Sequence, residues 1–358
     1  MRVLILHDAI PENARADMLD ALTQARVVSD ALVQLGHQPS TAPFDWNLSD
    51  MERMLVREAP DVVFNLVESV HGLGRLIYLA PALLDALGIA YTGAPTEAMF
   101  ITSNKLLTKR MLSDRGIRTP EWLDPRNSNH DAQSRDRRGA GSTGSIRFAP
   151  GRYIIKSLWE EASVGLDEDS VIFAEEPAKL LAELNKRLPS LGGEGFAERY
   201  IDGREFNIAL LCGGENPDVL PIAEIDFVGY GPEKPKVVGY RAKWDDTSYE
   251  YHHTPPRFDF PASDGPLLTQ LRELAGRCWQ ELTLRGWVRV DFRVDAEGTP
   301  WVLEINANPC LSPDAGYAAA LARAGISFPQ VVDRILRDAV CEGLPSVAPL
   351  RAASSALT

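Results

Sequence analysis

The chain has 358 residues, of which 45% are hydrophobic and 24% charged, and its formal net charge at pH 7 is −13. This length allows a large core divided over more than one domain, and the acidic balance without a dense basic stripe argues against non-specific binding to nucleic acid. No apolar run reaches the length of a membrane span. The opening MRVLILHDAIP has too short an apolar segment for a secretory signal, so we expect a cytoplasmic protein without a membrane partner.

A helical stretch followed by glycine and a strand-like entry recurs along the chain, and this punctuation predicts an α/β fold. Glycine suits the left-handed position after a helix end. The glycines concerned are Gly36, Gly88, Gly116, Gly286 and Gly325. The four cysteines are far apart and form no CxxC pair, which argues against a zinc cluster or a disulfide framework. Each cysteine is expected to be a buried, small apolar residue.

Residues 1–100 are expected to form a small parallel α/β domain, from which a helix over 104–118 leads out. The elements expected there, in chain order, are the strand RVLIL, a long helix to about Leu35, a helix near 50–58, the strand DVVFNLV and a helix over 76–87. The stretch 127–145 is polar, rich in glycine and serine and without apolar period, which predicts an insertion or a long loop.

The second half of the chain continues the mixed pattern. Residues 153–211 predict a strand, a loop, a helix and two further strands. An apolar stripe predicts an amphipathic helix over 267–282. The tail after about residue 345 is expected to be frayed.

Two strand-like stretches, WVRVDFRV (287–294) and WVLEIN (301–306), are separated by the turn-rich DAEGTP and predict an antiparallel hairpin. In the first strand, valines and Phe292 face one side, and the arginines and Asp291 face the other. If Val294 pairs with Trp301, the register sets two further opposed pairs. These are Asp291 with Glu304, and Arg289 with Asn306.

The polar face of this hairpin has two interpretations. Directly opposed side chains lie roughly 5 Å apart, and like charges there are unfavourable. A hard cation such as Mg²⁺, which takes oxygen ligands and shares them with phosphates, would relieve two carboxylates and an amide. The alternative is a solvated face on which Arg289 and Arg293 neutralise the acids. Lys156, at the end of an apolar strand in YIIKSLWEEASVG, also has two interpretations. It is either a phosphate ligand beside a small-residue loop or a lysine at a strand edge with a solvated ammonium.

Together these stretches resemble the ATP-grasp superfamily, and in particular its D-alanine–D-alanine ligase branch, over roughly residues 60–335. The matching stretches occur in the family's order: DVVFNLVES, GIAYTGAPTEAMFITSNKLLTKRML, YIIKS, ASVG, ERYIDGREFNIALL, LPIAEIDF, YRAKW and RVDFRV…LEINANP. The resemblance implies an α/β, ATP-grasp architecture of three consecutive subdomains that clasp ATP between the last two. We place them at 1–103, 104–202 with the polar insertion, and 203–345, followed by a tail at 346–358. Such proteins are commonly homodimers, so a homodimer is expected.

The resemblance also implies roles for individual residues. It assigns Lys105 and Lys156 to the ATP phosphates, with Ser163 in the adjacent loop, and Lys243 to the γ-phosphate. It assigns Glu198, Arg199, Tyr200 and Ile201 to the adenine-binding hinge, largely through backbone groups, and Glu205 to the ribose. It assigns Asp291, Glu304 and Asn306 to two Mg²⁺ ions, for which Mn²⁺ could substitute, and Arg289 to the reacting carboxyl. The implied reaction joins a carboxylate to an amine through an acyl phosphate.

The sequence departs from this family where amino-acid substrates are recognised. Ala162 stands where the ligases usually have serine, Trp244 replaces a tyrosine, and Cys310 replaces a glycine whose N–H binds the oxyanion. Cys310 retains a backbone N–H for that role. Glu68 and His71 either contact substrate or are structural. Because changed polar groups change the substrate, we expect small carboxylate and amine substrates other than two D-alanines.

Three alternatives remain open from the sequence. The chain could be a D-alanine–D-alanine ligase of cell-wall synthesis, for which D-alanine would stimulate ATP hydrolysis and yield the dipeptide. It could be an ATP-binding module without catalysis, in which Asp291→Asn and Glu304→Gln would leave biological activity intact. It could also be a kinase that phosphorylates a small acid and stops at that product.

Overall fold

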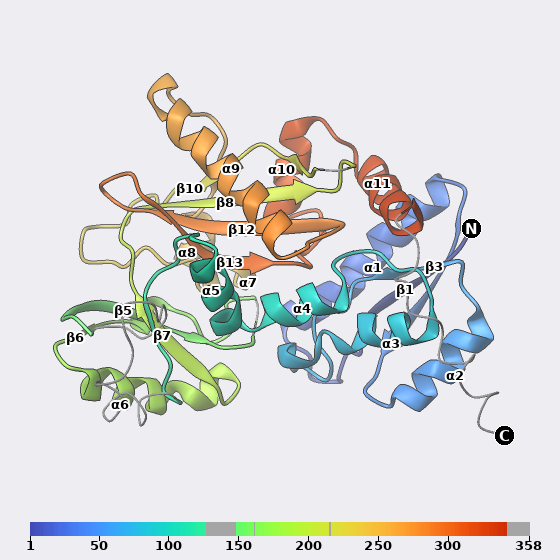
Figure 1. Ribbon diagram of the computed structural model, residues 1–358, viewed down its shortest axis with the longest axis horizontal. Coiled ribbons are helices and arrows are strands. Elements are labelled where there is room, and N and C mark those ends of the chain that lie inside the picture. Colours follow the sequence, from blue (N-terminus) through green and yellow to red (C-terminus); the bar gives the residue numbers. More distant parts are fainter. Residues whose placement is uncertain (127–147, 161, 215, 342–358) are drawn as a thin grey trace.

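The computed structural model describes residues 1–126, 148–160, 162–214 and 216–341 (Figure 1). The predicted insertion at 127–145 and the predicted tail at 346–358 lie outside the described residues. The α/β prediction is confirmed, because a parallel sheet and two antiparallel sheets alternate with helices along the chain. No described helix is long and apolar enough to cross a membrane.

The first sheet is parallel, with strand order β2-β1-β3. Alternating residues of β1 enter different cores: Val3 and Ile5 pack with α1 and with the last helix, α11 (Phe328–Cys341), and Leu4 and Leu6 pack with α2 and α3. Both faces of the sheet are therefore buried at β1 and β3, as is usual for parallel strands, whereas most of the edge strand β2 is exposed or half-buried. The elements are β1 (Arg2–Asp8), α1 (Ala16–Gln34), β2 (Gln38–Phe44), α2 (Leu48–Glu58), β3 (Val62–Asn65), η1 (Gly74–Leu76) and α3 (Leu79–Leu87).

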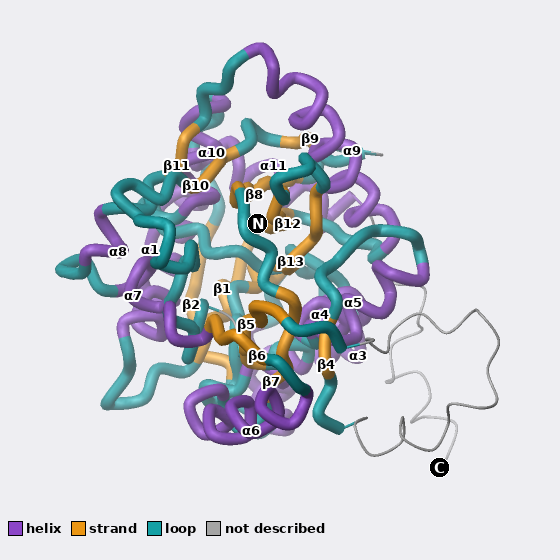
Figure 2. Tube along the Cα trace, turned by 90° about the vertical axis from the view of Figure 1, so that its left-hand side faces the viewer, coloured by secondary structure: helices purple, strands orange, loops and turns teal. Residues whose placement is uncertain are grey.

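Two short helices, α4 (Thr96–Ser103) and α5 (Lys105–Asp114), lead to the central sheet. Asn104 separates them, and its side chain accepts a hydrogen bond from Leu107 N at 3.0 Å, so that α5 begins at Lys105. The central sheet has the order β4-β7-β5-β6. Helix α6 covers the face of this sheet that points away from the third sheet (Figures 1 and 2). The elements are β4 (Trp122–Leu123), β5 (Gly151–Ser157), η2 (Glu168–Ser170), β6 (Val171–Ala174), α6 (Pro177–Arg187), η3 (Leu188–Leu191) and β7 (Gly195–Arg199).

The third sheet has the order β11-β10-β8-β12-β13, with β9 paired to β8. Its strands are β8 (Arg204–Leu211), β9 (Asp218–Val219), β10 (Ala223–Ile225), β11 (Pro256–Arg257), β12 (Trp287–Val294) and β13 (Pro300–Asn306). Its helices are α7 (Tyr240–Trp244), α8 (Tyr249–His252), η4 (Ala262–Asp264), α9 (Gly265–Glu281), α10 (Gly316–Ala324) and α11 (Phe328–Cys341). The last helix, α11, returns to the first sheet and packs against α1 (Figure 1).

The β12–β13 hairpin confirms two of the three predicted pairs and corrects the third. Asp291 is opposite Glu304 and Arg289 is opposite Asn306, as expected, but Val294 pairs with Pro300 instead of Trp301. The register shifts next to Asp291 because β13 has one extra residue, Leu303, that has no partner on β12. A β-bulge of this kind places two residues against one and bends the strand locally.

The five punctuating glycines all have positive φ, between 66° and 79°, which confirms the predicted left-handed positions. Gly286 is the most constrained, because a Cβ atom there would lie 2.8 Å from Gly93 Cα. Two expectations are only partly correct. The pattern at 153–211 does not predict β6, which occupies the expected loop, and the cysteines differ in exposure: Cys212 and Cys278 are buried, Cys310 is half-buried and Cys341 is exposed.

Candidate active site

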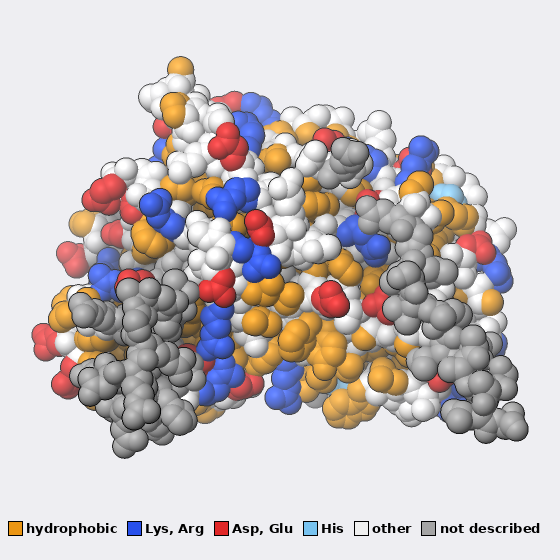
Figure 3. Space-filling model, viewed as in Figure 1, with side chains coloured by type: hydrophobic (Ala, Val, Ile, Leu, Met, Phe, Trp, Pro, Cys, Tyr) orange, Lys and Arg blue, Asp and Glu red, His pale blue; other side chains and the backbone are white. Residues whose placement is uncertain are grey.

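A cavity of about 440 Å³ lies between the central sheet and the third sheet, and residues of the first domain close one end of it. Strands β5 and β7 form one wall, and β8, β10, β12 and β13 form the other. The segment 236–244 covers it, and Asp20 and Glu68 reach it from the first domain. On the outer face seen in Figure 3, hydrophobic side chains gather over α3 and α4.

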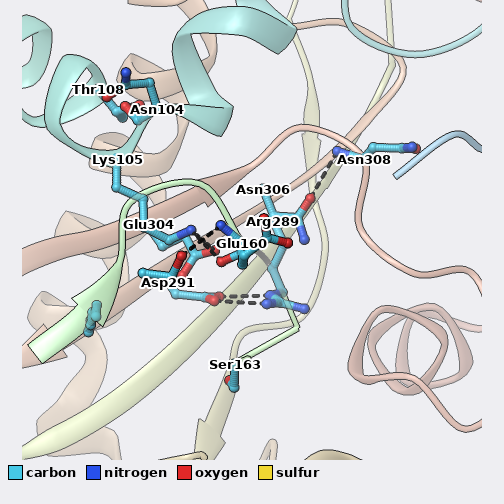
Figure 4. Close-up of polar contacts among 12 residues, drawn as sticks. Asn104, Lys105, Thr108, Glu160, Ser163, Arg289, Asp291, Glu304, Asn306 and Asn308 are labelled. Carbon is cyan, nitrogen blue, oxygen red and sulfur yellow. Dashed lines mark hydrogen bonds and ion pairs between the residues drawn. The ribbon is translucent and has the colours of Figure 1, made fainter. Parts of the chain in front are cut away.

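The polar face of the hairpin lines this cavity, as Figure 4 shows. The guanidinium of Arg289 donates to both oxygens of Asp291, at 2.8 and 2.9 Å, and Asn207 Nδ2 on β8 donates to Asp291 Oδ1 at 2.8 Å. The Lys105 ammonium lies 3.8 Å from Glu304 Oε1 and donates to the Glu160 carbonyl at 3.0 Å. Each carboxylate of the opposed pair therefore has a cationic neighbour.

The donor set on this face fits a hard divalent cation. Asp291, Glu304 and Asn306 offer carboxylate and amide oxygens from two adjacent strands, and all three line the cavity. Mg²⁺ prefers such oxygen ligands and completes its shell with water and phosphate. Over the described residues, no group of three or more His, Cys, Asp or Glu side chains is placed to hold a metal ion, so the set at the hairpin includes an amide, Asn306, beside its two carboxylates.

The predicted hinge residues line the cavity where β7 passes into β8. The Glu198 side chain points to two lysines instead of the cavity mouth: Lys109 Nζ is 2.6 Å from Oε2, and Lys156 Nζ is 2.7 Å from Oε1. Burial raises the pKa of the Glu198 carboxyl, but the two lysines outweigh burial and hold that pKa below its usual value. The backbone N–H groups of Arg199 and Tyr200 donate to the carbonyls of Glu121 and Arg152, at 2.8 and 3.1 Å. The adenine-binding role that the resemblance implies for residues 198–201 stays a prediction.

Glu205 lies opposite Arg293 on β12, and Arg293 Nη2 is 2.7 Å from Glu205 Oε2. Glu205 is 9% exposed and lines the cavity beside the hinge. Arg293 also donates to the carbonyl of Lys236 in the covering segment. This ion pair therefore fixes the place where the hinge, β12 and the covering segment meet.

The small-residue loop and the covering segment hold each other. Ser163 Oγ donates to the Val238 carbonyl at 2.9 Å, and Trp244 Nε1 donates to the Ala162 carbonyl at 3.2 Å. Lys243, which is on α7 beside Trp244, lines the cavity. From the same helix, Tyr240 donates to Asp17 of α1 at 2.9 Å. The covering segment is thus bonded to the central domain and to the first domain at once.

The end of the cavity next to the first domain is acidic. Gln24 Nε2 donates to Glu68 Oε1 at 2.7 Å and to Asp20 Oδ2 at 3.2 Å, and its side-chain oxygen Oε1 accepts from Leu311 N at 2.9 Å. Burial, opposed by the Gln24 hydrogen bond and reinforced by neighbouring aspartates, raises the pKa of Glu68 to about 8. Gln24 therefore joins α1, the loop after β3 and the segment after β13.

Cys310 lines the same acidic end of the cavity, and its thiol donates a hydrogen bond to Asp20 Oδ2, with Sγ at 2.9 Å. Burial, together with Glu68 and Asp20, raises the pKa of the Cys310 thiol well above its usual value, which makes it a poor nucleophile. His71 is not among the cavity-lining residues. Its ring stacks on Trp46 at 4.3 Å, and its Nε2 lies 2.9 Å from Asp45 Oδ2, so the structure places it away from the cavity.

Four residues at this site are absent from the sequence-based set: Lys109, Asn207, Asp20 and Gln24. Two had a local signal. Lys109 follows Lys105 by four residues, which places both on one face of a helix. Asn207 follows Glu205 by two residues, which places both on one face of a strand. Asp20 and Gln24 lie on a helix far from the site in sequence and gave no such signal.

Comparison with known proteins agrees with this geometry. The family model described as D-ala D-ala ligase C-terminus matches residues 153–337. A D-alanine–D-alanine ligase of Moorella thermoacetica is 31% identical over 88% of this chain and 93% of its own length. An uncharacterized protein, y4sG, of Sinorhizobium fredii is 30% identical over 86% and 84%.

Solved structures share the fold. The crystal structure of D-alanine–D-alanine ligase from Bacillus anthracis complexed with ATP has a TM-score of 0.64 at 17% identity and covers 96% of this chain and 98% of its own. The ligase from Coxiella burnetii has a TM-score of 0.66 at 18% identity, covering 96% and 94%. The fold is therefore that of an ATP-grasp enzyme. The chain belongs to the D-alanine–D-alanine ligase family, whose members form C–N bonds and release ADP and phosphate.

Proposed function

We propose that this protein is an ATP- and Mg²⁺-dependent ligase that joins a carboxylate to an amine, and that its two substrates are not both D-alanine. One observation supports it most. The oxygen donors of the hairpin, the guanidinium of Arg289, and the cations Lys156 and Lys243 line a single cavity whose walls come from separate domains. This is the arrangement that phosphoryl transfer needs, since catalysis there rests on positioning and charge neutralisation.

The proposed reaction has two steps. A carboxylate oxygen attacks the γ-phosphorus of ATP, the bond to the β-phosphate oxygen breaks, and ADP leaves. The amine nitrogen then attacks the acyl carbon, the phosphate leaves, and the nitrogen loses a proton to give the amide. Bound Mg²⁺, which Asp291, Glu304 and Asn306 would hold as two ions, neutralises phosphate charge.

The residues of the chain would contribute the rest. Arg289, a permanent cation at the cavity wall, is suited to the oxyanion that forms when the amine attacks. Lys243 would approach the γ-phosphate from the covering segment, whose bonds to Ala162 and Asp17 keep bulk water away from an acyl phosphate. The hinge backbone would hold adenine, and Glu205 would accept from the ribose.

The substrate proposal rests on the changed polar groups. Ala162, which stands where the ligases usually have serine, lines the cavity without a side-chain donor, and Trp244 uses its indole N–H on a backbone carbonyl. A pocket that lacks hydrogen-bond partners for a substrate's polar groups discriminates against that substrate. We further propose a cytoplasmic homodimer, as the family resemblance suggests.

The test is a screen of paired acids and amines with ATP and Mg²⁺, read by ADP release and by product mass. We expect an amide product from an unlike pair, with one ADP per amide. Formation of D-alanyl-D-alanine as the fastest reaction would replace the substrate proposal with the cell-wall activity. A stable phosphorylated acid without amide would indicate a kinase. No ADP release with any pair, despite ATP binding, would favour a non-catalytic module.

A further inference from the structure

The carboxylate of Glu198 has a lysine on each of its two oxygens, and the two lysines differ in what else they face. Lys109 is 2% exposed, and its ammonium contacts Glu198 and the Thr119 hydroxyl, 2.6 Å away. The Lys156 side chain is 13% exposed and lines the nucleotide cavity. One lysine is therefore enclosed, and the other is within reach of a ligand.

The secondary structure dictates this arrangement. Glu198 on β7 pairs with Ile154 on β5, so that Lys156, two residues further along β5, is its diagonal neighbour on the same face of the sheet. Lys109 reaches the opposite oxygen from α5, one helical turn after Lys105. The cap at Asn104 sets where α5 begins and hence the direction of both lysines.

The charges of this buried group do not cancel. One carboxylate faces two ammonium groups, and burial strengthens every interaction among them because the dielectric constant is low. If Lys109 balances Glu198, the charge of Lys156 remains available to an anion in the cavity. Without Lys109, Glu198 and Lys156 would form a neutral buried pair. The ammonium of Lys156 would then stay bound to Glu198 and would not be available to an anion in the cavity.

We propose that Lys109 is a positioning residue of the nucleotide site: it neutralises Glu198 so that the ammonium of Lys156 can bind the phosphates of ATP. This inference rests on the proposed function, in which the cavity binds ATP. It differs from a role in folding alone, because it predicts an effect on phosphate binding that does not extend to the nucleoside.

The experiment compares the affinities of ATP and adenosine, by calorimetry, for the wild-type protein, Lys109→Met, Glu198→Gln and the double variant. Lys109→Met should raise the Kd of ATP by about tenfold and leave that of adenosine within about twofold. The double variant lacks both buried charges and should recover ATP affinity to within about threefold of wild type. Lys186→Met, the same change at an exposed α6 lysine that is 4.0 Å from Glu183, is the matched control and should change neither Kd.

Equal losses of ATP and adenosine affinity in Lys109→Met, or a double variant as weak as Lys109→Met, would overturn the inference. If Lys109→Met does not fold, Glu198→Gln decides alone: its preference for ATP over adenosine should equal or exceed that of wild type, and a lower preference overturns the inference. Failure of the wild-type protein to bind ATP would instead refute the proposed function. The two failures are therefore distinguishable.

Discussion

Asp291 lies directly opposite Glu304 on the neighbouring strand, and a different cation contacts each carboxylate. Arg289 binds the first from its own strand, and Lys105 approaches the second from α5. Two opposed like charges are unfavourable, and these cations offset that repulsion. Since Arg289 and Lys105 are also the groups we assign to substrate and phosphate, a divalent ion at the carboxylates would release both for those roles.

The carboxylate pair gives the first prediction. Asp291→Asn and Glu304→Gln should each lower turnover by about a hundredfold or more, because each removes a charged metal ligand while keeping its size. ADP release measured against Mg²⁺ concentration should show a weaker dependence on the metal, and a chelator should stop the wild-type reaction. Asp333→Asn, at an exposed ion pair on α11, is the control and should have wild-type kinetics. Unchanged turnover in both site variants would refute the metal assignment.

Glu68 predicts a pH dependence of stability. Its pKa, raised from 4.5 to about 8, means that the folded protein holds a proton that the unfolded chain releases above pH 4.5. Stability therefore falls as the pH rises from about 5 to 8, since the unfolded state binds fewer protons in that range. Glu68→Gln mimics the protonated form and should remove this loss. Between pH 5 and pH 8, the free energy of unfolding of Glu68→Gln relative to wild type should rise by on the order of 3 kcal/mol, measured by urea unfolding.

A constant difference between Glu68→Gln and wild type across this pH range would show that Glu68 titrates normally. Glu12→Gln, an exposed carboxyl in the loop after β1, is a suitable control, because it removes a carboxylate without removing a buried one.

Substitutions at Gly286 and Gly325 distinguish two energetic costs of replacing a glycine, namely backbone strain at positive φ and steric overlap of the new Cβ atom. Both have positive φ, 73° and 70°, so alanine is strained at either position. At Gly286 the new Cβ would also lie 2.8 Å from Gly93 Cα, whereas at Gly325 nothing lies within 4 Å. Gly325→Ala should cost about 1 kcal/mol, and Gly286→Ala several times more, because a backbone must move. Thermal or denaturant unfolding measures both, and equal costs would mean that the Gly93 segment yields easily.

Tyr240 gives a test of the covering segment. Tyr240→Phe removes the hydrogen bond to Asp17 that joins α7 to α1, and hydrogen bonds to charged groups contribute about 1.5–3 kcal/mol when buried. Because this bond is partly exposed, we expect roughly a threefold to tenfold rise in KM and faster proteolysis of the covering segment, 236–244. Tyr249→Phe is the matched control, since its hydroxyl donates to the carbonyl of Val228 and both residues lie outside the covering segment. Equal behaviour of the two variants would exclude a closing role for the Asp17 bond.

The sequence predicted the hairpin faces because strict alternation fixes which side chains share a face. It did not predict the bulge at Leu303, although a signal exists. Val302 and Ile305 both enter the core, and residues three apart cannot share a face of a regular strand. The strict alternation of β12 therefore does not extend along the whole of β13.

The spacing from Lys105 places Lys109 on the same helix face, but the pairing of Lys109 with Glu198 could not be predicted from the sequence. Lysine is rarely buried without a partner, and its partner Glu198 lies on a strand reached only through the intervening fold. The acidic end of the cavity is similar: Gln24 contacts Glu68 and Leu311, residues 44 and 287 positions away. Contacts at such separations depend on how the domains pack, and a single sequence has no periodic pattern that records them.

The extra residue at Leu303 has a consequence for how this enzyme can vary. A slip of one residue in a strand normally turns all its side chains to the opposite face. Here the slip is confined to the stretch between the turn and Leu303, and the side chains that we assign to the metal lie beyond it. The bulge thus allows one residue to be gained or lost at the hairpin tip while Asp291 and Glu304 stay opposed.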